Sequence, residues 1–476
     1  MPTNNLLNIK FILYLLTGLS GIIQLILSKT IVDFSSVALL VALNLFVIIY
    51  CFNDKYFFNY PLSLNIIFFS YFFSYGGALY LNTLEFRHIN TRLNLPGELL
   101  IYLSYFWLVI IFSHLIYRKM KSLGTIKNKL NNFLFKINVI NVKDYDFLIF
   151  LTFVGYGAYV IAFFYSKRNE DHSIYFDILQ GFRVFYLAPI LIIFSDKLYN
   201  IGKNKNKFFL LTICFIIIVV VAISSNSRGK FYSIIFLYFI ILFISYQIYE
   251  TRRIRLSFNK ILMALLIAIV SFSVLEIISV NFLQSRGERH IQNRFERIEH
   301  YMANFNLKKI VQFKKERIDS QKHQILSEFM YENTIYNRLN LIYTHDQNYL
   351  MVKDFNDEHR EVLRELTIGK TIAIFPKPLI NIFIADFDKL KYIKVSLGSY
   401  VRNLYGKEYV LSRALGSLPV LYKLIFGNYF PIFLFFSSIV IFVLGDSFYD
   451  NKKFLISPIF IICAFSAGGG FLGILS

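Results

Sequence analysis

The stretch Gln284-Ser-Arg-Gly-Glu-Arg-His-Ile-Gln-Asn-Arg-Phe-Glu-Arg297 opens the polar interruption that decides the fold of this chain. The interruption runs from Arg286 to about Val420, and apolar spans stand on both sides of it in an otherwise almost continuously hydrophobic sequence. This plan predicts a set of membrane helices with one large folded loop at one surface. The loop is the predicted place of function.

The composition places the chain among integral membrane proteins. Of 476 residues, 56% are hydrophobic and only 17% are charged, which is too little charge to cover a soluble protein of this size. A helix crosses about 30 Å of hydrocarbon with about 20 residues. Eleven spans of that length are predicted: Phe11–Leu27, Ser35–Phe52, Tyr60–Leu81, Leu99–Tyr117, Phe147–Tyr165, Tyr175–Phe194, Phe208–Ser225, Phe231–Ile248, Ile261–Phe282, Leu421–Leu444 and Phe454–Leu475.

The short loops divide sharply by charge, which predicts the orientation. Alternate loops, including the basic segment Arg118 to Lys143, carry more than twice as many Lys and Arg residues as the others. Positively charged loops stay in the cytoplasm, so the long loop is expected outside. The expected fold is an all-α polytopic membrane protein with about 11–12 transmembrane helices and one large periplasmic loop containing helices. Residues 1–282 would hold nine helices, 283–420 the loop and 421–476 the last helices.

Cations gather on one side of the segment that leaves the ninth span. If the helix continues at about 100° per residue, Arg286, Arg289, His290, Arg294 and Arg297 share one face. The planar Arg guanidinium presents several N–H donors in a fixed arrangement to phosphate oxygens, so this row of cations is a candidate binding site for a lipid-linked phosphate. A solvated helix face touching lipid headgroups is an equally good interpretation.

Two further charged residues lie near the predicted outer membrane boundary. Glu276 is an acid deep in the ninth span, where such a group normally faces a cavity or a partner. A structural ion pair with an Arg of a neighbouring span is the favoured interpretation, and a general base or substrate contact is the alternative. Arg228 sits in a very short outer turn beside Gly229, where it can contact a lipid phosphate or simply reach toward headgroups.

The loop itself has few motifs of known chemistry. An apolar patch after Pro376-Lys-Pro378 is too short to span the bilayer and is a candidate re-entrant segment. The many Tyr residues of the loop are better explained as core than as sugar-stacking surfaces. The sequence contains no zinc-type spacing, Walker-type loop or dinucleotide fingerprint. We therefore expect no metal and no cofactor, and the net charge of +20 is attributed to anionic lipid and not to nucleic acid.

Several short matches together resemble the O-antigen polymerase (Wzy-type) family. They are Ser227-Arg-Gly229 opening a span, Asn337-Arg-Leu-Asn340 inside the loop, Ile374-Phe-Pro-Lys-Pro378, and the stretch Leu415 to Phe430 re-entering the membrane. Members commonly have about twelve spans with both ends inside. The family's usual Trp after Lys377 is absent here.

The resemblance implies a glycosyltransferase of the bacterial inner membrane that joins undecaprenyl-diphosphate-linked repeat units at the periplasmic face. Carried over by position, Arg228, Arg338 and Lys377 match the family's basic residues. A hydroxyl of the acceptor sugar would attack the anomeric carbon of the growing chain. The predicted diphosphate-binding residues are Arg228, Arg286, Arg289, Arg294 and Lys377, and the predicted catalytic residues are Glu276, His290 and Arg338.

The expected partners are the lipid-linked glycan, membrane lipids and a chain-length regulator protein, with no nucleic acid among them. A ligase that moves finished glycan from the same carrier shares this site. A transporter or flippase for anionic glycolipid is a rival of another class. It predicts charges in many spans and inverted repeats, and neither is found in the sequence.

Overall fold

The computed structural model describes residues 3–136, 145–165 and 417–450, and, with gaps, parts of 209–217, 275–321, 331–392 and 453–454. These residues form helices and turns, apart from one antiparallel pair of two-residue strands, β1 (Tyr449–Asp450) and β2 (Lys453–Phe454). The helical fold class is confirmed for the part of the chain that is described.

Five of the described helical segments are long and apolar enough to cross a membrane. They are Leu6–Leu27, Ile31–Cys51, Pro61–Leu84, Pro96–Lys119 and Pro419–Ser447. These coincide with the first four predicted spans and with the tenth, as expected of a multi-pass membrane protein. Helix α8 (Tyr145–Tyr165) covers the fifth predicted span. The other predicted spans lie wholly or largely outside the described residues.

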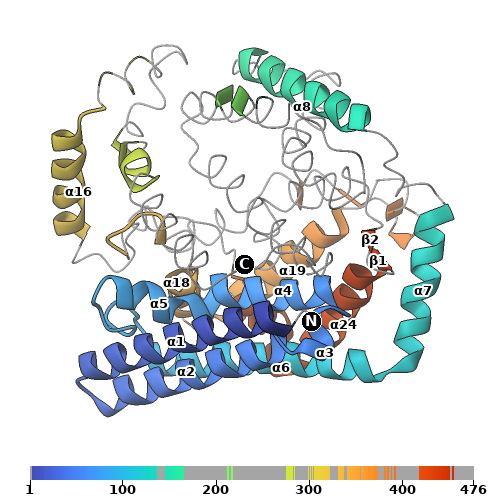
Figure 1. Cartoon of the computed structure of the whole chain (residues 1–476), viewed down its shortest axis with the longest axis horizontal. Coiled ribbons are helices and arrows are strands. Elements are labelled where there is room, and N and C mark those ends of the chain that lie inside the picture. Colours follow the sequence, from blue (N-terminus) through green and yellow to red (C-terminus); the bar gives the residue numbers. More distant parts are fainter. Residues whose placement is uncertain are drawn as a thin grey trace.

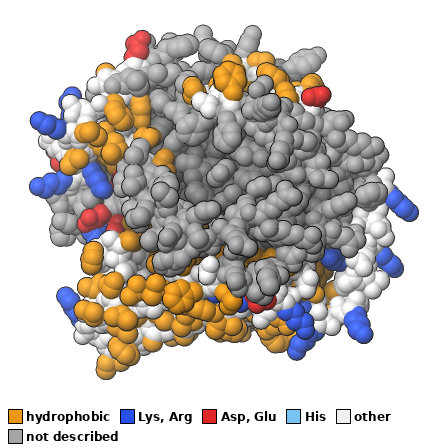
Figure 2. Space-filling view, in the orientation of Figure 1, with side chains coloured by type: hydrophobic (Ala, Val, Ile, Leu, Met, Phe, Trp, Pro, Cys, Tyr) orange, Lys and Arg blue, Asp and Glu red, His pale blue; other side chains and the backbone are white. Residues whose placement is uncertain are grey.

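The spanning helices lie side by side in one layered bundle (Figure 1). Its members are α1 (Thr3–Leu27), α2 (Ile31–Cys51), α4 (Pro61–Tyr71) continued by η1 (Phe72–Gly76) and α5 (Gly77–Leu84), α6 (Pro96–Lys119) and α24 (Phe430–Ser447). Their shared core includes Leu40, Val47, Leu64 and Leu103, all fully buried. The outer faces are apolar as well, and Figure 2 shows a nearly continuous hydrophobic surface over α1 and α2. A bundle with an apolar core and apolar outer faces is suited to a lipid environment.

The helix starts are fixed by local sequence. Thr30 and Asp33 form a reciprocal capping box at the first turn of α2. Helices α4, α6 and α24 each begin with a proline in the first turn, where its missing N–H costs nothing. The short helix α3 (Asp54–Phe57) separates α2 from α4 and is capped by Asn53.

The third span is interrupted by a π-helical turn, η1, which the sequence pattern does not predict. A π-turn leaves carbonyl groups without their usual helical partners. Here the loop supplies donors, since the N–H of Leu341 donates to the carbonyl of Phe73 at 2.8 Å and the Asn340 amide donates to that of Phe72 at 3.3 Å. At about 1.5 Å per residue, these carbonyls lie well inside the span. Residues 340–341 of the loop therefore dip into the bundle.

The tenth predicted span is divided into two helices and is not one continuous helix. Helix α23 (Leu418–Phe426) ends at Gly427, whose φ of 53° and ψ of −128° suit only glycine. A short 3-10 turn, η4 (Gly427–Tyr429), then leads into α24, and Pro431 in its first turn has no N–H to continue the preceding helix.

Further described helices lie outside the bundle layer. Helix α7 (Lys121–Lys136) follows α6 at its carboxyl end, whereas α16 (Leu307–Gln321), α18 (Ile342–Lys353) and α19 (Asp357–Ala373) belong to the large loop. Helices α18 and α19 pack with α23 around a small core of Val352, Phe355, Leu363, Val420 and Leu424. This three-helix unit covers the end of the bundle at which α6 begins.

Candidate functional site

Buried carboxylates hold the loop on the bundle by accepting backbone N–H groups. Asp346, on α18, accepts from the backbone N–H groups of Asn94 and Leu95 at 2.8 and 3.1 Å and from the Asn94 side chain at 2.7 Å. These donors belong to the start of α6, where a negative charge also complements the helix dipole. Burial raises the pKa of Asp346, and the three hydrogen bonds oppose that change. Asp346 thus acts as an N-terminal cap supplied from about 250 residues away.

Glu85 makes a second attachment of the same kind. It follows α5 directly and accepts the backbone N–H groups of Glu332 and Asn333 at 3.1 and 2.8 Å. Arg87 bridges Glu85 and Glu332. Burial raises the pKa of the Glu85 carboxyl.

Buried tyrosines complete this attachment. Asn82 donates to the hydroxyl of Tyr331 and accepts from that of Tyr343. Tyr331 and Tyr343 are both buried, which confirms the prediction that loop tyrosines serve as core for these two residues.

Glu276 is the one predicted site residue that lies among the described residues. One of its oxygens accepts from the backbone N–H of Thr334 at 2.9 Å and from its hydroxyl at 2.7 Å, and the other lies 3.1 Å from the Lys314 ammonium. An ion pair was the favoured interpretation, but the partner is a Lys of the loop helix α16 and not an Arg of a neighbouring span. Glu276 therefore joins the ninth predicted span to two parts of the loop.

The remaining predicted site residues lie outside the described residues. They are Arg228, Arg286, Arg289, His290, Arg294, Arg338 and Lys377. Of the Asn337-Arg-Leu-Asn340 motif, Asn340 is described, and its side chain reaches the π-turn of the third span.

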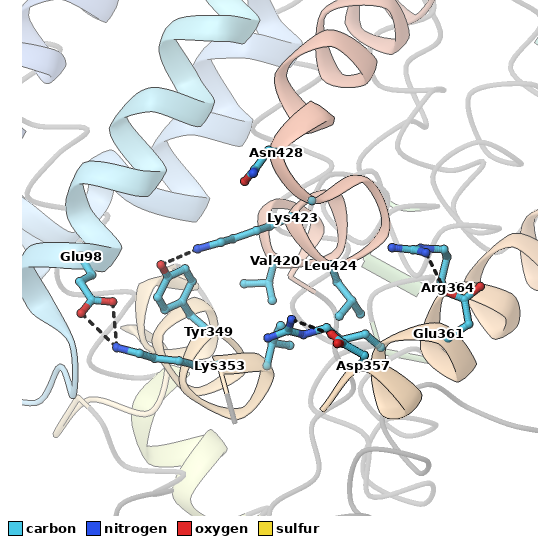
Figure 3. A pocket seen from close by; sticks show the side chains of 13 residues that line it. Glu98, Tyr349, Lys353, Asp357, Glu361, Arg364, Val420, Lys423, Leu424 and Asn428 are labelled. Atoms are coloured by element: carbon cyan, nitrogen blue, oxygen red, sulfur yellow. Dashed lines mark hydrogen bonds and ion pairs between the residues drawn. The ribbon is translucent and has the colours of Figure 1, made fainter. Parts of the chain in front are cut away.

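A pocket of about 570 Å³ lies where the three-helix unit meets the first turn of α6 (Figure 3). Its walls come from α18, α19, α23, the turn at Gly427 and Asn428, and Glu98 of α6. Just beyond Asn428, the exposed apolar residues Ile432, Phe433 and Phe436 begin the outer face of α24. The pocket therefore lies at the boundary between the polar loop and the apolar surface of the bundle.

Three ion pairs line the pocket, and all are solvent-exposed. Lys353 pairs with Glu98 at 3.1 Å, Arg360 with Asp357 at 3.4 Å and Arg364 with Glu361 at 2.7 Å. Exposed pairs contribute only about 0–1 kcal/mol each to stability, so their groups exchange partners readily. Arg364 is more firmly placed than the others, since its Nε donates to the carbonyl of Ile425 at 2.9 Å near the end of α23.

Lys423 is the fourth cation of the pocket, and it has no carboxylate partner among the described residues. Its Nζ donates to the hydroxyl of Tyr349 at 2.6 Å and lies 4.3 Å from the centre of that ring. The ring of Tyr102 is 5.1 Å away on α6. Figure 3 shows the Lys423 side chain extending from α23 across the pocket toward Tyr349. Aromatic faces hold the ammonium in place without neutralising it.

Buried hydrogen bonds fix the helix that carries Lys423. The Tyr102 hydroxyl donates to the carbonyl of Pro419 at 2.6 Å, and His345 Nδ1 lies 2.8 Å from the hydroxyl oxygen of Ser417, the N-cap of α23. Burial lowers the pKa of His345 to about 3, which keeps the ring neutral. The start of α23 is thus positioned by α6 and α18 together.

A second polar network lies at the opposite end of the bundle, where α6 ends. Asp446 of α24 accepts from the backbone N–H and the hydroxyl of Ser63 at 3.0 and 2.8 Å and from Tyr117 at 3.1 Å. His114 connects Ser63 to the hydroxyl of Tyr50. All of these groups are buried. The network satisfies Asp446 and caps the first turn of α4, which is a structural role.

No protein-family model, curated protein or solved structure matches this chain. The fold and the site therefore define a class and no more: a helical protein typical of multi-pass membrane proteins, with a charged pocket at one end of its bundle.

The pocket offers a defined chemistry to a ligand. Exposed carboxylates accept hydrogen bonds from hydroxyl groups, the Lys and Arg side chains donate to oxygens, and the Lys423 ammonium provides one excess positive charge. Sequence reasoning did not identify Glu98, Lys353 or Lys423, because their partners lie far away along the chain. Lys423 was visible only as a lone cation in an apolar stretch.

Proposed function

We propose that this protein is a membrane glycosyltransferase that joins oligosaccharide units carried on a polyprenyl diphosphate, as an O-antigen-type polymerase does. The observation that carries the proposal is the seating of the polar loop on the bundle end, where it encloses a charged pocket beside the apolar surface of α24. A substrate with a lipid tail and a sugar head needs both surfaces at one place. The family resemblance of the Arg-containing motifs supplies the reaction type.

In the proposed reaction, an acceptor sugar hydroxyl attacks the anomeric carbon of the growing chain. The new glycosidic bond forms as the bond to the diphosphate breaks, and polyprenyl diphosphate leaves. Arg228, Arg286, Arg289 and Arg338 would stabilise the charge that develops on the diphosphate. The hydroxyl proton passes to a general base. The contacts of Glu276 with Thr334 and Lys314 favour a structural role for that acid, which makes His290 the first candidate.

Two alternatives differ from this proposal in product or in class. A ligase would transfer finished glycan from the same carrier. A glycolipid flippase would need polar groups along a path through the bundle. Glu276 and Asp446, two buried acids among the described residues of the spans, are both engaged by neighbouring residues, which favours the enzyme.

Deletion of the gene and complementation with variants tests the proposal. Surface polysaccharide is separated on a gel after complementation with the wild type, Arg338→Ala or the matched control Lys309→Ala, which alters an exposed cation of α16. We expect long chains with the wild type and the control, and single repeat units on the final acceptor with Arg338→Ala. Polymer retained on the carrier lipid would identify a ligase, and an unchanged profile in the deletion strain would refute the proposal.

A further inference from the structure

The pocket beside Gly427 has one more cation than carboxylate. Its charged lining consists of Lys353, Arg360, Arg364, Lys423, Glu98, Asp357 and Glu361. Three of the cations face a carboxylate within 4 Å, so the excess charge is that of Lys423. The Lys423 Nζ lies 4.3 Å from the centre of the Tyr349 ring and 5.1 Å from that of Tyr102, and Figure 3 shows its side chain extending across the cavity toward Tyr349. A lysine fixed this way is prepared for an anion that comes from outside.

The volume of the pocket and its other lining residues indicate the chemical nature of the rest of the ligand. A volume of about 570 Å³ is typical of small-molecule sites. The exposed carboxylates and cations around Lys423 form weak ion pairs with each other, and both kinds of group can exchange these partners for the hydroxyl groups of a ligand. A diphosphate would need more unpaired cations than this pocket provides. An apolar ligand would leave seven charged groups facing it.

We propose that this pocket binds a sugar bearing one negative group, a carboxylate or a phosphate, with the Lys423 ammonium on that group. The identification of the ligand as part of a glycan rests on the proposed function, whereas the need for an anion follows from the pocket. In the intact enzyme, the pocket holds a charged sugar of the repeat unit. Lys423 thereby makes the enzyme prefer glycans with an acidic unit.

Chemical protection of Lys423 tests this binding directly. The purified full chain in neutral phosphatidylcholine nanodiscs is treated with a lysine-methylating reagent, and the modification rate at Lys423 is followed by mass spectrometry. Lys309, exposed on α16, serves as the internal reference. The probes are glucuronic acid, glucose 1-phosphate, glucose and inorganic phosphate. We expect the first two to slow modification at Lys423 and not at Lys309.

Two variants separate charge from fold, with glucuronic acid binding to the purified protein measured by titration calorimetry. Lys423→Gln removes the charge, and binding of glucuronic acid should weaken at least about tenfold, the loss expected for a charge-assisted hydrogen bond. Lys423→Arg keeps the charge and should retain most of the affinity. The protection assay on the wild type needs no variant, so the proposal stays testable if Lys423→Gln fails to fold.

Four other outcomes of the protection assay would each contradict the proposal that this pocket binds a negatively charged sugar. Equal protection by glucose would show that the negative group is irrelevant, and equal protection by inorganic phosphate would show that the sugar is irrelevant. Protection by anionic phosphatidylglycerol nanodiscs without any sugar would make Lys423 a lipid-headgroup contact. If none of the probes slows modification of Lys423, the pocket does not bind a charged sugar. Because the binding assay is independent of polymer formation, an unchanged polysaccharide profile in the deletion strain would defeat the proposed function separately.

Discussion

At the scale of single residues, the contacts of Glu276 predict that it holds the loop and does not transfer protons. Gln at this position can still accept the Thr334 N–H but loses the charge that faces Lys314. We expect Glu276→Gln to keep polymer formation within about tenfold of the wild type, since loss of a general base costs about 10²–10⁴ in rate. The measurement is the chain-length profile together with the rate of polymer synthesis in membranes.

The matched variant for this test is Glu276→Ala, which removes both acceptor oxygens. It should leave the Thr334 N–H unsatisfied, which costs about 1–3 kcal/mol, and make residues 331–336 more sensitive to protease. A Glu276→Gln protein that resists protease normally and yet makes no polymer would restore Glu276 as the catalytic base.

His345 predicts a dependence of stability on pH. In the folded protein, burial lowers its pKa to about 3, whereas an unfolded chain takes up the proton near about pH 6.5. Between these values the unfolded state binds more protons, so the free energy of unfolding falls as pH falls, by at most about 1.4 kcal/mol per pH unit for this group. Thermal unfolding in detergent between pH 5 and 7 should have a flatter pH dependence for His345→Gln than for the wild type. The control is His359→Gln, on the partly exposed face of α19, and equal slopes for His345→Gln and wild type would contradict the prediction.

At the scale of elements, the start of α6 depends on a carboxylate from another helix. Asp346→Ala removes the buried acceptor for the part-buried N–H groups of Asn94 and Leu95, and leaving such a donor unsatisfied costs at most about 1–3 kcal/mol. We expect faster amide hydrogen exchange at residues 94–99 and looser docking of α18. Glu358→Ala, which removes an exposed acid of α19, is the control and should leave exchange in this segment unchanged. Equal exchange in both variants would show that the cap is not needed.

The π-turn in the third span predicts a strict requirement for glycine. A Cβ at Gly76 would lie 2.3 Å from the ring of Tyr71 and 2.6 Å from Asn44 Oδ1, two side chains that are hydrogen-bonded to each other. Gly76→Ala should therefore destabilise the protein by about 1–3 kcal/mol, as overpacking does. Gly18→Ala, where no atom lies within 4 Å, should be neutral or slightly stabilising in a thermal melt. A neutral Gly76→Ala would mean that the π-turn relaxes easily.

These elements also show where sequence reasoning succeeds. The lengths of the continuous apolar runs alone predict the first four spans and the tenth, with ends within a few residues of those in the structure. They suffice because crossing a bilayer requires a continuous apolar run. The π-turn and the break at Gly427 were missed, since neither changes the hydropathy of its segment. Both are stabilised by distant residues, such as Leu341 on the π-turn and Arg364 at the end of α23.

At the scale of the whole molecule, the candidate site was the least predictable part. Glu98 and Lys353 are 255 residues apart, and Lys423 meets Tyr349 across 74 residues. A single sequence shows the charge of each residue but not which charges meet. The sequence correctly marked Glu276 as a residue with a partner, because an acid in an apolar span needs one. The predicted partner, an Arg of a neighbouring span, was wrong. The actual partner is Lys314 of α16, and no local sequence pattern indicates that α16 packs next to Glu276.

The geometry of α6 leads to the last prediction, which concerns the two sides of the membrane. Its 24 residues extend for about 36 Å, enough to cross the bilayer. The large loop is attached at its first turn through Asp346 and Lys353, whereas α7 follows its last turn. The loop and α7 must therefore lie on opposite sides if α6 spans. Helix α7 contains Lys121, Lys127, Lys129 and Lys136 and no acid, which predicts that its side is the cytoplasm.

Cysteine labelling decides this orientation. In a chain with Cys51, Cys214 and Cys463 replaced by Ala, single cysteines are placed at the exposed positions Lys129 on α7 and Lys309 on α16. A membrane-impermeant maleimide added to intact spheroplasts should label Lys309→Cys and not Lys129→Cys, and lysis should make both reactive. Labelling of both in intact cells would show that α6 does not span. The reverse pattern would place the pocket in the cytoplasm, where glycan already moved to the outer leaflet cannot reach it, and the proposed polymerase would fail with it.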